Sequence, residues 1–248
     1  TVVGQPSTRV AWLQFNTING DSPVNDLKVR QALNYAIDRD SLIAGVLDGY
    51  AVKVASISTP EYDDYDASVQ GYTYDPEKAK SLLAEAGYAD GFTVDLSVSG
   101  GLLNATDVAQ AVASQLAEVG VTVNIQQEDS ATQRDKIMSG TVAPIFLNGL
   151  GGPYCDIDLI ASIGFTKGAR YCTWDSAEFV DLASRAAAAV DDTERAQLHS
   201  EMQQFMVDQA PAVWLYQQDT LYAYNSAKVQ NWTARTDEVV LMDGVSVQ

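Results

Sequence analysis

The sequence has few of the residues on which enzyme and metal chemistry usually depends. It contains one histidine and two cysteines in 248 residues. A Ser–His–Asp triad would have to use His199, and no G-x-S-x-G segment is present to supply the serine. A zinc site would need further His or Cys ligands beside the two thiols. We therefore predict no catalytic residue, no metal site and no cofactor, and we interpret His199 as a surface histidine or one satisfied within a helix.

Basic residues and long apolar runs are also scarce. Only 15 residues are Lys or Arg, against 33 Asp or Glu, which gives a formal net charge of -18. Such a surface repels phosphate backbones and anionic membranes, so we expect no nucleic-acid partner. No stretch approaches the roughly 18 consecutive apolar residues of a membrane-spanning helix. The hydrophobic share of 46% is that of a folded domain with a sizeable core.

The first residues, TVVGQPSTRV, include no initiator Met, basic start or apolar signal core. We expect that a leader was removed or that the chain is a piece of a longer protein.

Strand patterns and helix patterns alternate along the chain, which predicts an α/β fold with helices on both faces of a sheet. The segment 74–92, YDPEKAKSLLAEAGYADGF, marks a helix at both ends: Asp75 is a good N-cap, Pro76 suits the first turn, and Gly87 can end the helix in a left-handed conformation. Residues 50–73 are predicted to be a long irregular surface loop. Strands are predicted at 9–16, 92–98, 121–127, 142–149, 210–216 and 220–225. Helices are predicted at 29–47 with a restart at Asp38, and at 75–87, 105–119, 129–140, 157–164 after Asp156, 175–190 capped by Asp175, and 192–208 capped by Asp191 or Asp192.

Ligands of α/β sheets bind at loops beyond strand ends, so the loop after strand 142–149 is the first candidate. Its segment GLGGP (149–153) has neither a Walker nor a dinucleotide spacing, and it predicts a close backbone approach, either to a ligand or to packed neighbours. The acidic segment 63–66 is interpreted as a solvated loop. A carboxylate pair for glycoside hydrolysis stays an open alternative that no particular pair favours.

Cys155 and Cys172 are close enough in sequence for a disulfide, which would contribute about 3 kcal/mol by the chain-entropy argument. The alternative is two separate buried thiols. Aromatic residues near predicted strand ends can line a small-molecule cleft or belong to the core: Trp12, Tyr154, Tyr171, Trp174, Trp214 and Tyr216.

Several segments together resemble the family 5 extracellular solute-binding proteins, the dipeptide-, oligopeptide- and nickel-type binding components of bacterial ABC importers. They are VRQALNYAIDRDSLI (29–43), YDPEKAKSLLAEAGYADGF (74–92), QLAEVGVTVNIQQ (115–127) and DQAPAVWLYQQ (208–218), after the opening RVAWLQFNT. The resemblance implies a periplasmic-binding-protein type II lobe with a mixed sheet flanked by helices. It also implies that the N-terminal half of a member is absent. Residues 1–15 would then be the strand or hinge that enters the lobe, and 16–210 would form the α/β ligand-binding lobe. Residues 211–248 would be the returning strands and a C-terminal segment that belong partly to the other lobe.

By this resemblance the protein captures a solute between two lobes and delivers it to a membrane permease. It would act as a monomer in the periplasm or outside the cell. A lipid anchor on the absent N-terminal part is one option. The ligand-binding residues that it implies are Trp12, Asn148, Leu150, Tyr154, Arg170, Tyr171, Trp174 and Tyr216. The sequence NGLGGPYCD departs from the peptide-binding pattern, because Leu150 stands where a tryptophan is expected and Asp156 follows late. The solute is therefore left open among peptides, sugars and other small molecules. An α/β hydrolase and a sensory or docking module are the alternative functions.

Overall fold

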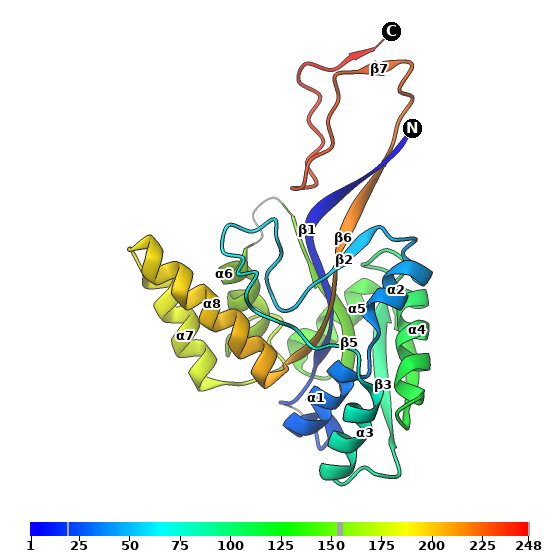
Figure 1. The fold of residues 1–248 in the computed structure, drawn as a ribbon, viewed down its shortest axis with the longest axis vertical. Helices are drawn as coiled ribbons and strands as arrows, with labels where there is room; N and C mark the ends of the chain where they lie inside the picture. Colours follow the sequence, from blue (N-terminus) through cyan, green and yellow to red (C-terminus); the bar gives the residue numbers. More distant parts are fainter. Residues whose placement is uncertain (19, 153–155, 248) are drawn as a thin grey trace.

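The computed structural model describes residues 1–18, 20–152 and 156–247, and its framework is a six-stranded mixed sheet (Figure 1). The order across the sheet is β2 (Ala51–Lys53), β6 (Ala212–Ala223), β1 (Val2–Phe15), β5 (Ile145–Leu150), β3 (Phe92–Ser99) and β4 (Val121–Glu128). β1 pairs antiparallel with β5 and β6, β2 pairs antiparallel with β6, and β3 pairs parallel with β4 and β5. The predicted α/β class with a mixed sheet flanked by helices is confirmed.

The helices cover both faces of the sheet (Figure 1). They are η1 (Pro23–Asn25), α1 (Leu27–Tyr35), α2 (Arg39–Val46), α3 (Pro76–Glu85), α4 (Ala105–Ala117), α5 (Ser130–Ser139), α6 (Ile157–Ile160) with the π-helical turn η2 (Ala161–Phe165), α7 (Ala177–Ala188) and α8 (Asp192–Gln209). Among the described residues, no helix has the length and apolar character needed to cross a membrane.

Strand β1 divides the interior into two cores because successive side chains of a strand point to opposite faces. Ala11, Leu13 and Phe15 pack with α1 to α4 in the first core. Val10 and Trp12 pack with α6 to α8 in the second. Burial on both faces explains why this stretch is apolar at nearly every position.

Local sequence signals located most helix ends correctly. The Asp75 side chain accepts a hydrogen bond from the Lys78 amide at 2.9 Å, and Gly87 has a φ of +89°. The predicted restart at Asp38 is also confirmed, since its side chain accepts from the Ser41 amide at the start of α2. The predicted cap of α7 is wrong: Ser176 caps this helix, and Asp175 pairs instead with Lys167.

The predicted start of strand 9–16 and the predictions for 50–73 and 210–225 need correction. β1 begins at Val2, and β6 is one continuous strand rather than two. Residues 50–73 include β2 and also contribute to the second core, because Ile57 is fully buried and Tyr62 is 5% exposed. They are therefore a packed segment and not a surface loop.

The paired strands β1 and β6 extend beyond the helices and carry the C-terminal segment with β7 (Val229–Gln230) and β8 (Ser246–Val247) (Figure 1). The far end of this ribbon is closed by Thr1 and Tyr224, whose backbone groups exchange hydrogen bonds of 2.9 and 3.1 Å.

Candidate functional site

A cavity of about 270 Å³ lies between β1, β5, α5 and the α6–η2 segment, close to the lower size limit of about 300 Å³ for small-molecule sites. Its wall combines apolar side chains with a few polar groups, as such sites usually do. The lining residues are Trp12, Ser130, Gln133, Arg134, Ile137, Asn148, Gly149, Leu150, Ile160, Ile163, Gly164 and Tyr171.

Gln14, which is fully buried on β1, holds the cavity wall together. Its Oε1 accepts hydrogen bonds from Trp12 Nε1 at 3.1 Å and from Asn148 Nδ2 at 3.0 Å. Its Nε2 donates to the carbonyl oxygens of Gly164 at 3.2 Å and Tyr171 at 3.0 Å. One amide thus orients two side chains and fixes two backbone segments that line the cavity.

Helix α5 contributes the opposite wall through Ser130, Gln133, Arg134 and Ile137, whose spacing places them on one face. Gln133 is 6% exposed and fully engaged: its Nε2 donates to Ser97 Oγ at 3.0 Å, and its Oε1 accepts from Ser99 Oγ at 2.7 Å. These bonds attach the helix to β3 and fix its distance from the rest of the wall.

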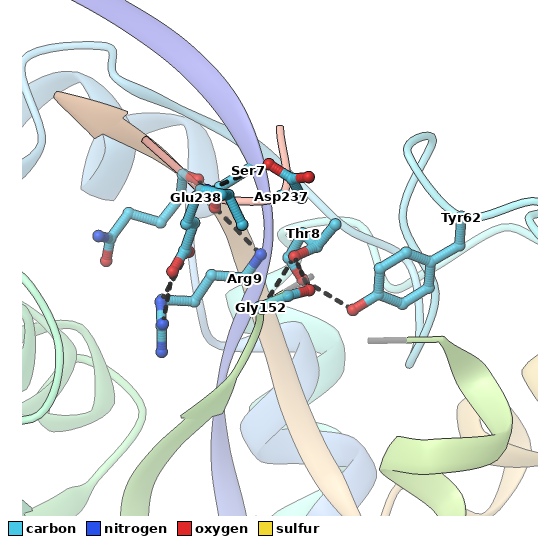
Figure 2. Close-up of polar contacts among 9 residues, drawn as sticks. Ser7, Thr8, Arg9, Tyr62, Gly152, Asp237 and Glu238 are labelled. Atoms are coloured by element: carbon cyan, nitrogen blue, oxygen red, sulfur yellow. Dashed lines mark hydrogen bonds and ion pairs between the residues drawn. The ribbon is translucent and has the colours of Figure 1, made fainter. Parts of the chain in front are cut away.

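The loop after β5 is held in place by Thr8 of β1 (Figure 2). The Thr8 hydroxyl donates to the carbonyl oxygen of Gly152 at 2.9 Å and accepts from the Gly152 amide at 3.0 Å. The backbone carbonyl of Thr8 accepts from the Tyr62 hydroxyl at 2.7 Å, and its amide donates to Thr236 at 3.1 Å. Three segments distant in sequence therefore meet at this residue.

The adjacent Arg9 binds the C-terminal segment through a two-pronged ion pair with Glu238, with N–O distances of 3.1 and 2.9 Å (Figure 2). The backbone of Gly151 passes so close to Arg9 that a Cβ at this glycine would lie 2.5 Å from the Arg9 Cα. A Cβ at Gly149 would similarly lie 2.8 Å from the carbonyl oxygen of Val10. Of the two interpretations of the glycine-rich segment, these two glycines support close packing against β1.

The structure brings half of the predicted ligand-binding residues together, since Trp12, Asn148, Leu150 and Tyr171 line one cavity. Arg170 is exposed beside it, with its guanidinium carbon 5.5 Å from the centroid of the Tyr171 ring. Tyr154 lies outside the described residues. The ligand-binding role of these residues stays a prediction.

Trp174 and Tyr216 belong instead to the hydrophobic cores, and neither lines the cavity. Trp174 packs against Phe179 and Phe205, at centroid distances of 5.8 and 6.3 Å. Tyr216 is fully buried in the first core, and burial raises the pKa of its hydroxyl. We therefore leave both residues out of the proposed site.

Cys172 has a free thiol, whose Sγ donates to the carbonyl oxygen of Trp174 at 2.8 Å. Burial raises the pKa of this thiol. Its predicted partner, Cys155, lies outside the described residues, so the disulfide stays a prediction that the free thiol does not support.

His199 is buried away from the cavity, 3.2 Å from Asp158 through its Nε2. Burial lowers its pKa, but the hydrogen bond to Asp158 and the charges of Asp158 and Asp64 outweigh that effect and raise it overall. His199 borders a separate acidic hollow that includes Glu61, Asp63, Asp64, Asp156, Asp158 and Asp192. Within the described ranges, this hollow included, no group of three His, Cys, Asp or Glu side chains is arranged to hold a metal ion.

Gln14, Gln133, Arg134 and Ile137 were not predicted as site residues. The α5 residues could have been found from their shared helical face once this helix was placed beside strand 142–149. Gln14 had a weaker signal: a polar residue inside an otherwise apolar strand needs a buried partner.

Residues 1–170 match the bacterial extracellular solute-binding proteins, family 5 Middle. The dipeptide-binding protein of Escherichia coli K12 is 34% identical over 217 residues, which cover 84% of this chain and 40% of that protein. The glutathione-binding protein GsiB of Pectobacterium atrosepticum is 31% identical over 251 residues, which cover 95% of this chain and 47% of that protein. The chain thus spans less than half the length of these relatives.

Solved structures have the same fold over the whole chain. AppA from Clostridium difficile aligns with a TM-score of 0.88 at 21% identity, over 100% of this chain and 52% of that one. A dipeptide binding protein from Pseudoalteromonas sp. SM9913, in complex with Met-Leu, aligns with a TM-score of 0.85 at 25% identity, over 100% of this chain and 50% of that one.

Proposed function

The chain belongs to the bacterial extracellular solute-binding proteins of family 5, and from this membership we propose that it is part of the solute-binding component of an ABC-type importer. The members named above are binding proteins rather than enzymes. In this proposal the protein captures a peptide or another small solute and delivers it to a membrane permease, in the periplasm or outside the cell.

The observation that carries the proposal is the cavity whose wall is fixed by Gln14. Trp12, Asn148 and Tyr171 come from separate parts of the chain, and Gln14 contacts all three through side-chain or backbone atoms. A wall that is ordered before the solute arrives lowers the entropy lost on binding.

We also propose the domain organisation implied by the resemblance. Residues 16–210 form the solute-binding lobe, whereas 1–15 and 211–248 connect it to the remainder of the protein. The pairing of β1 with β6 supports this organisation, because the two strands together form a ribbon that extends beyond the helices (Figure 1). Closure of two lobes around the solute would then involve movement about these strands.

Native mass spectrometry of the protein at its full natural length, purified without added solute, tests the proposal. We expect a small molecule to be retained and to be released on denaturation. Its identity would separate a peptide carrier from a carrier of sugars or other solutes. Failure to retain or bind any peptide, sugar or other small solute would contradict the transport role and favour a docking module.

A further inference from the structure

Positive charge dominates the described wall of the cavity. Arg134 is the one charged side chain among the described lining residues, and no Asp or Glu accompanies it there. This is unusual for a chain in which acidic residues outnumber basic ones 33 to 15. The charge of the wall is therefore opposite to that of the protein as a whole.

The amide side chains of the wall already have partners. Asn148 donates to Gln14, and its Oδ1 accepts from the Gly149 amide at 2.9 Å. Gln133 uses both ends of its amide to bind Ser97 and Ser99. These groups maintain the wall, which leaves the guanidinium of Arg134 as its strongest available hydrogen-bond donor.

In the described part of the chain, Arg134 makes only a long ion pair, with the neighbouring Asp135. Its Nε lies 4.0 Å from Asp135 Oδ1, which is too long for a hydrogen bond, and its side chain is 48% exposed. A second cation lies nearby, because Arg170 stacks over the ring of Tyr171, itself a lining residue. No ion pair joins Arg170 to a carboxylate among the described residues.

Apolar side chains occupy the rest of the wall. Ile137 and Ile160 are 5% and 0% exposed, and Ile163 and Leu150 are half-buried. An arginine beside an apolar surface favours a solute with a planar anionic end and a hydrophobic body.

We propose that the cavity binds a solute with a carboxylate, which pairs with the guanidinium of Arg134, and an apolar group, which packs against Ile137, Ile160 and Ile163. This rests on the proposed solute-binding function and narrows its ligand class to acidic amphipathic solutes. A peptide would enter with its C-terminal carboxylate toward α5. A sugar would need an acid group to bind with comparable affinity.

Calorimetric titration of the protein at its full natural length with two matched pairs of probes tests the inference. The first pair is the dipeptide Met-Leu and its C-terminal amide; the second is glucuronate and glucose. The variants are Arg134→Gln, Arg134→Lys and the control Arg185→Gln. Arg185 is an exposed arginine on α7 that does not line the cavity and lies 3.7 Å from Asp181.

We expect a carboxylate probe to bind at least about ten-fold more tightly than its neutral partner, as a charge-assisted hydrogen bond would give. Arg134→Gln should remove this preference, Arg134→Lys should retain part of it, and Arg185→Gln should leave it unchanged. Equal binding of acid and neutral probes, or an unchanged preference in Arg134→Gln, would overturn the inference and leave the binding function intact. If neither Met-Leu nor glucuronate binds, the inference is overturned, whereas the proposed solute-binding function is decided separately by whether the protein retains a solute in native mass spectrometry.

Discussion

Replacing Thr8 with valine isolates the contact that holds the loop after β5. Valine has nearly the shape of threonine but lacks the hydroxyl that bonds both backbone groups of Gly152. The backbone contacts of Thr8 with Tyr62 and Thr236 do not involve its side chain, so they are retained. The variant therefore tests the two side-chain bonds alone.

The magnitude follows from the number of bonds and their exposure. Each hydrogen bond contributes about 0.5–1.5 kcal/mol, so two bonds correspond to about 1–3 kcal/mol. Thr8 is 8% exposed, but Gly152 is half-buried and water can satisfy part of its hydrogen-bonding capacity. We therefore expect a loss of about 1–2 kcal/mol in the free energy of unfolding, or roughly 2–8 °C in Tm for a chain of this size.

Urea unfolding of wild type, Thr8→Val and Thr8→Ser measures the change in the free energy of unfolding. Amide hydrogen exchange shows which part of the chain becomes less protected. Thr8→Ser keeps the hydroxyl and should restore most of the stability. Exchange of the Gly152 amide should accelerate in Thr8→Val and stay slow in Thr8→Ser. Solute binding should weaken in Thr8→Val, because Leu150, the last residue of β5 before this loop, lines the cavity and would have to be ordered on binding. If Thr8→Val unfolds like wild type with unchanged exchange at Gly152, the hydroxyl does not hold the loop.

Three further substitutions address packing, a buried hydroxyl and a titrating pair. Gly151→Ala should destabilise the protein by about 1–3 kcal/mol in urea unfolding, because its Cβ would overlap Arg9. The control Gly45→Ala, at an exposed position of α2, should stabilise the protein by about 0.5–1 kcal/mol, and similar effects of both substitutions would contradict the close approach. Tyr216→Phe should raise the free energy of unfolding by about 1 kcal/mol, because the buried hydroxyl has no hydrogen-bond partner among the described residues. It should leave solute affinity unchanged, and weaker binding would return Tyr216 to the site. The pKa of folded His199 lies above the unfolded value of 6.5, so its contribution to stability is fully present below that pH and is lost as the pH rises through the folded pKa. The stability advantage of wild type over His199→Gln should therefore be larger near about pH 5.5 than near about pH 8.5, and a difference that grows with pH would exclude the Asp158 pairing.

Elements with local end signals could be predicted from the sequence, whereas elements held by distant partners could not. Helix α3 was located because its capping residue, proline and terminal glycine lie within one short segment. The first half of β1, VVGQPST, has no apolar alternation, and it is a strand because its backbone pairs with β6 more than 200 residues later. Likewise, separate strands were predicted at 210–216 and 220–225 because the residues between them are polar. They form one strand, β6, because its backbone pairs with β1.

The site residues, too, could be predicted only in part from the local sequence, and Tyr216 illustrates the physical reason. A simple strand would place Trp214 and Tyr216 on one face, and both were among the aromatic residues predicted to line a cleft or to belong to the core. The register shifts within this part of the pair, so that Trp12 faces Trp214 while the preceding Ala11 faces Tyr216. This irregularity puts Trp214 in the second core and Tyr216 in the first. Nothing in the local sequence marks a bulge whose position depends on a strand from the other end of the chain.

Strand β1 sets the register of the core and of the cavity together. Its odd-numbered residues from Ala11 fill the first core, while Trp12 and Gln14 face the cavity side. A slip of one residue would exchange these faces, burying the Gln14 amide among aliphatic side chains and placing Leu13 at the wall. Both consequences are unfavourable, the first because a buried amide without partners is costly. The stability of the core therefore enforces the geometry of the wall. Under the proposed binding role, we expect substitutions on α5, at Arg134, to change solute specificity with less loss of stability than substitutions on β1.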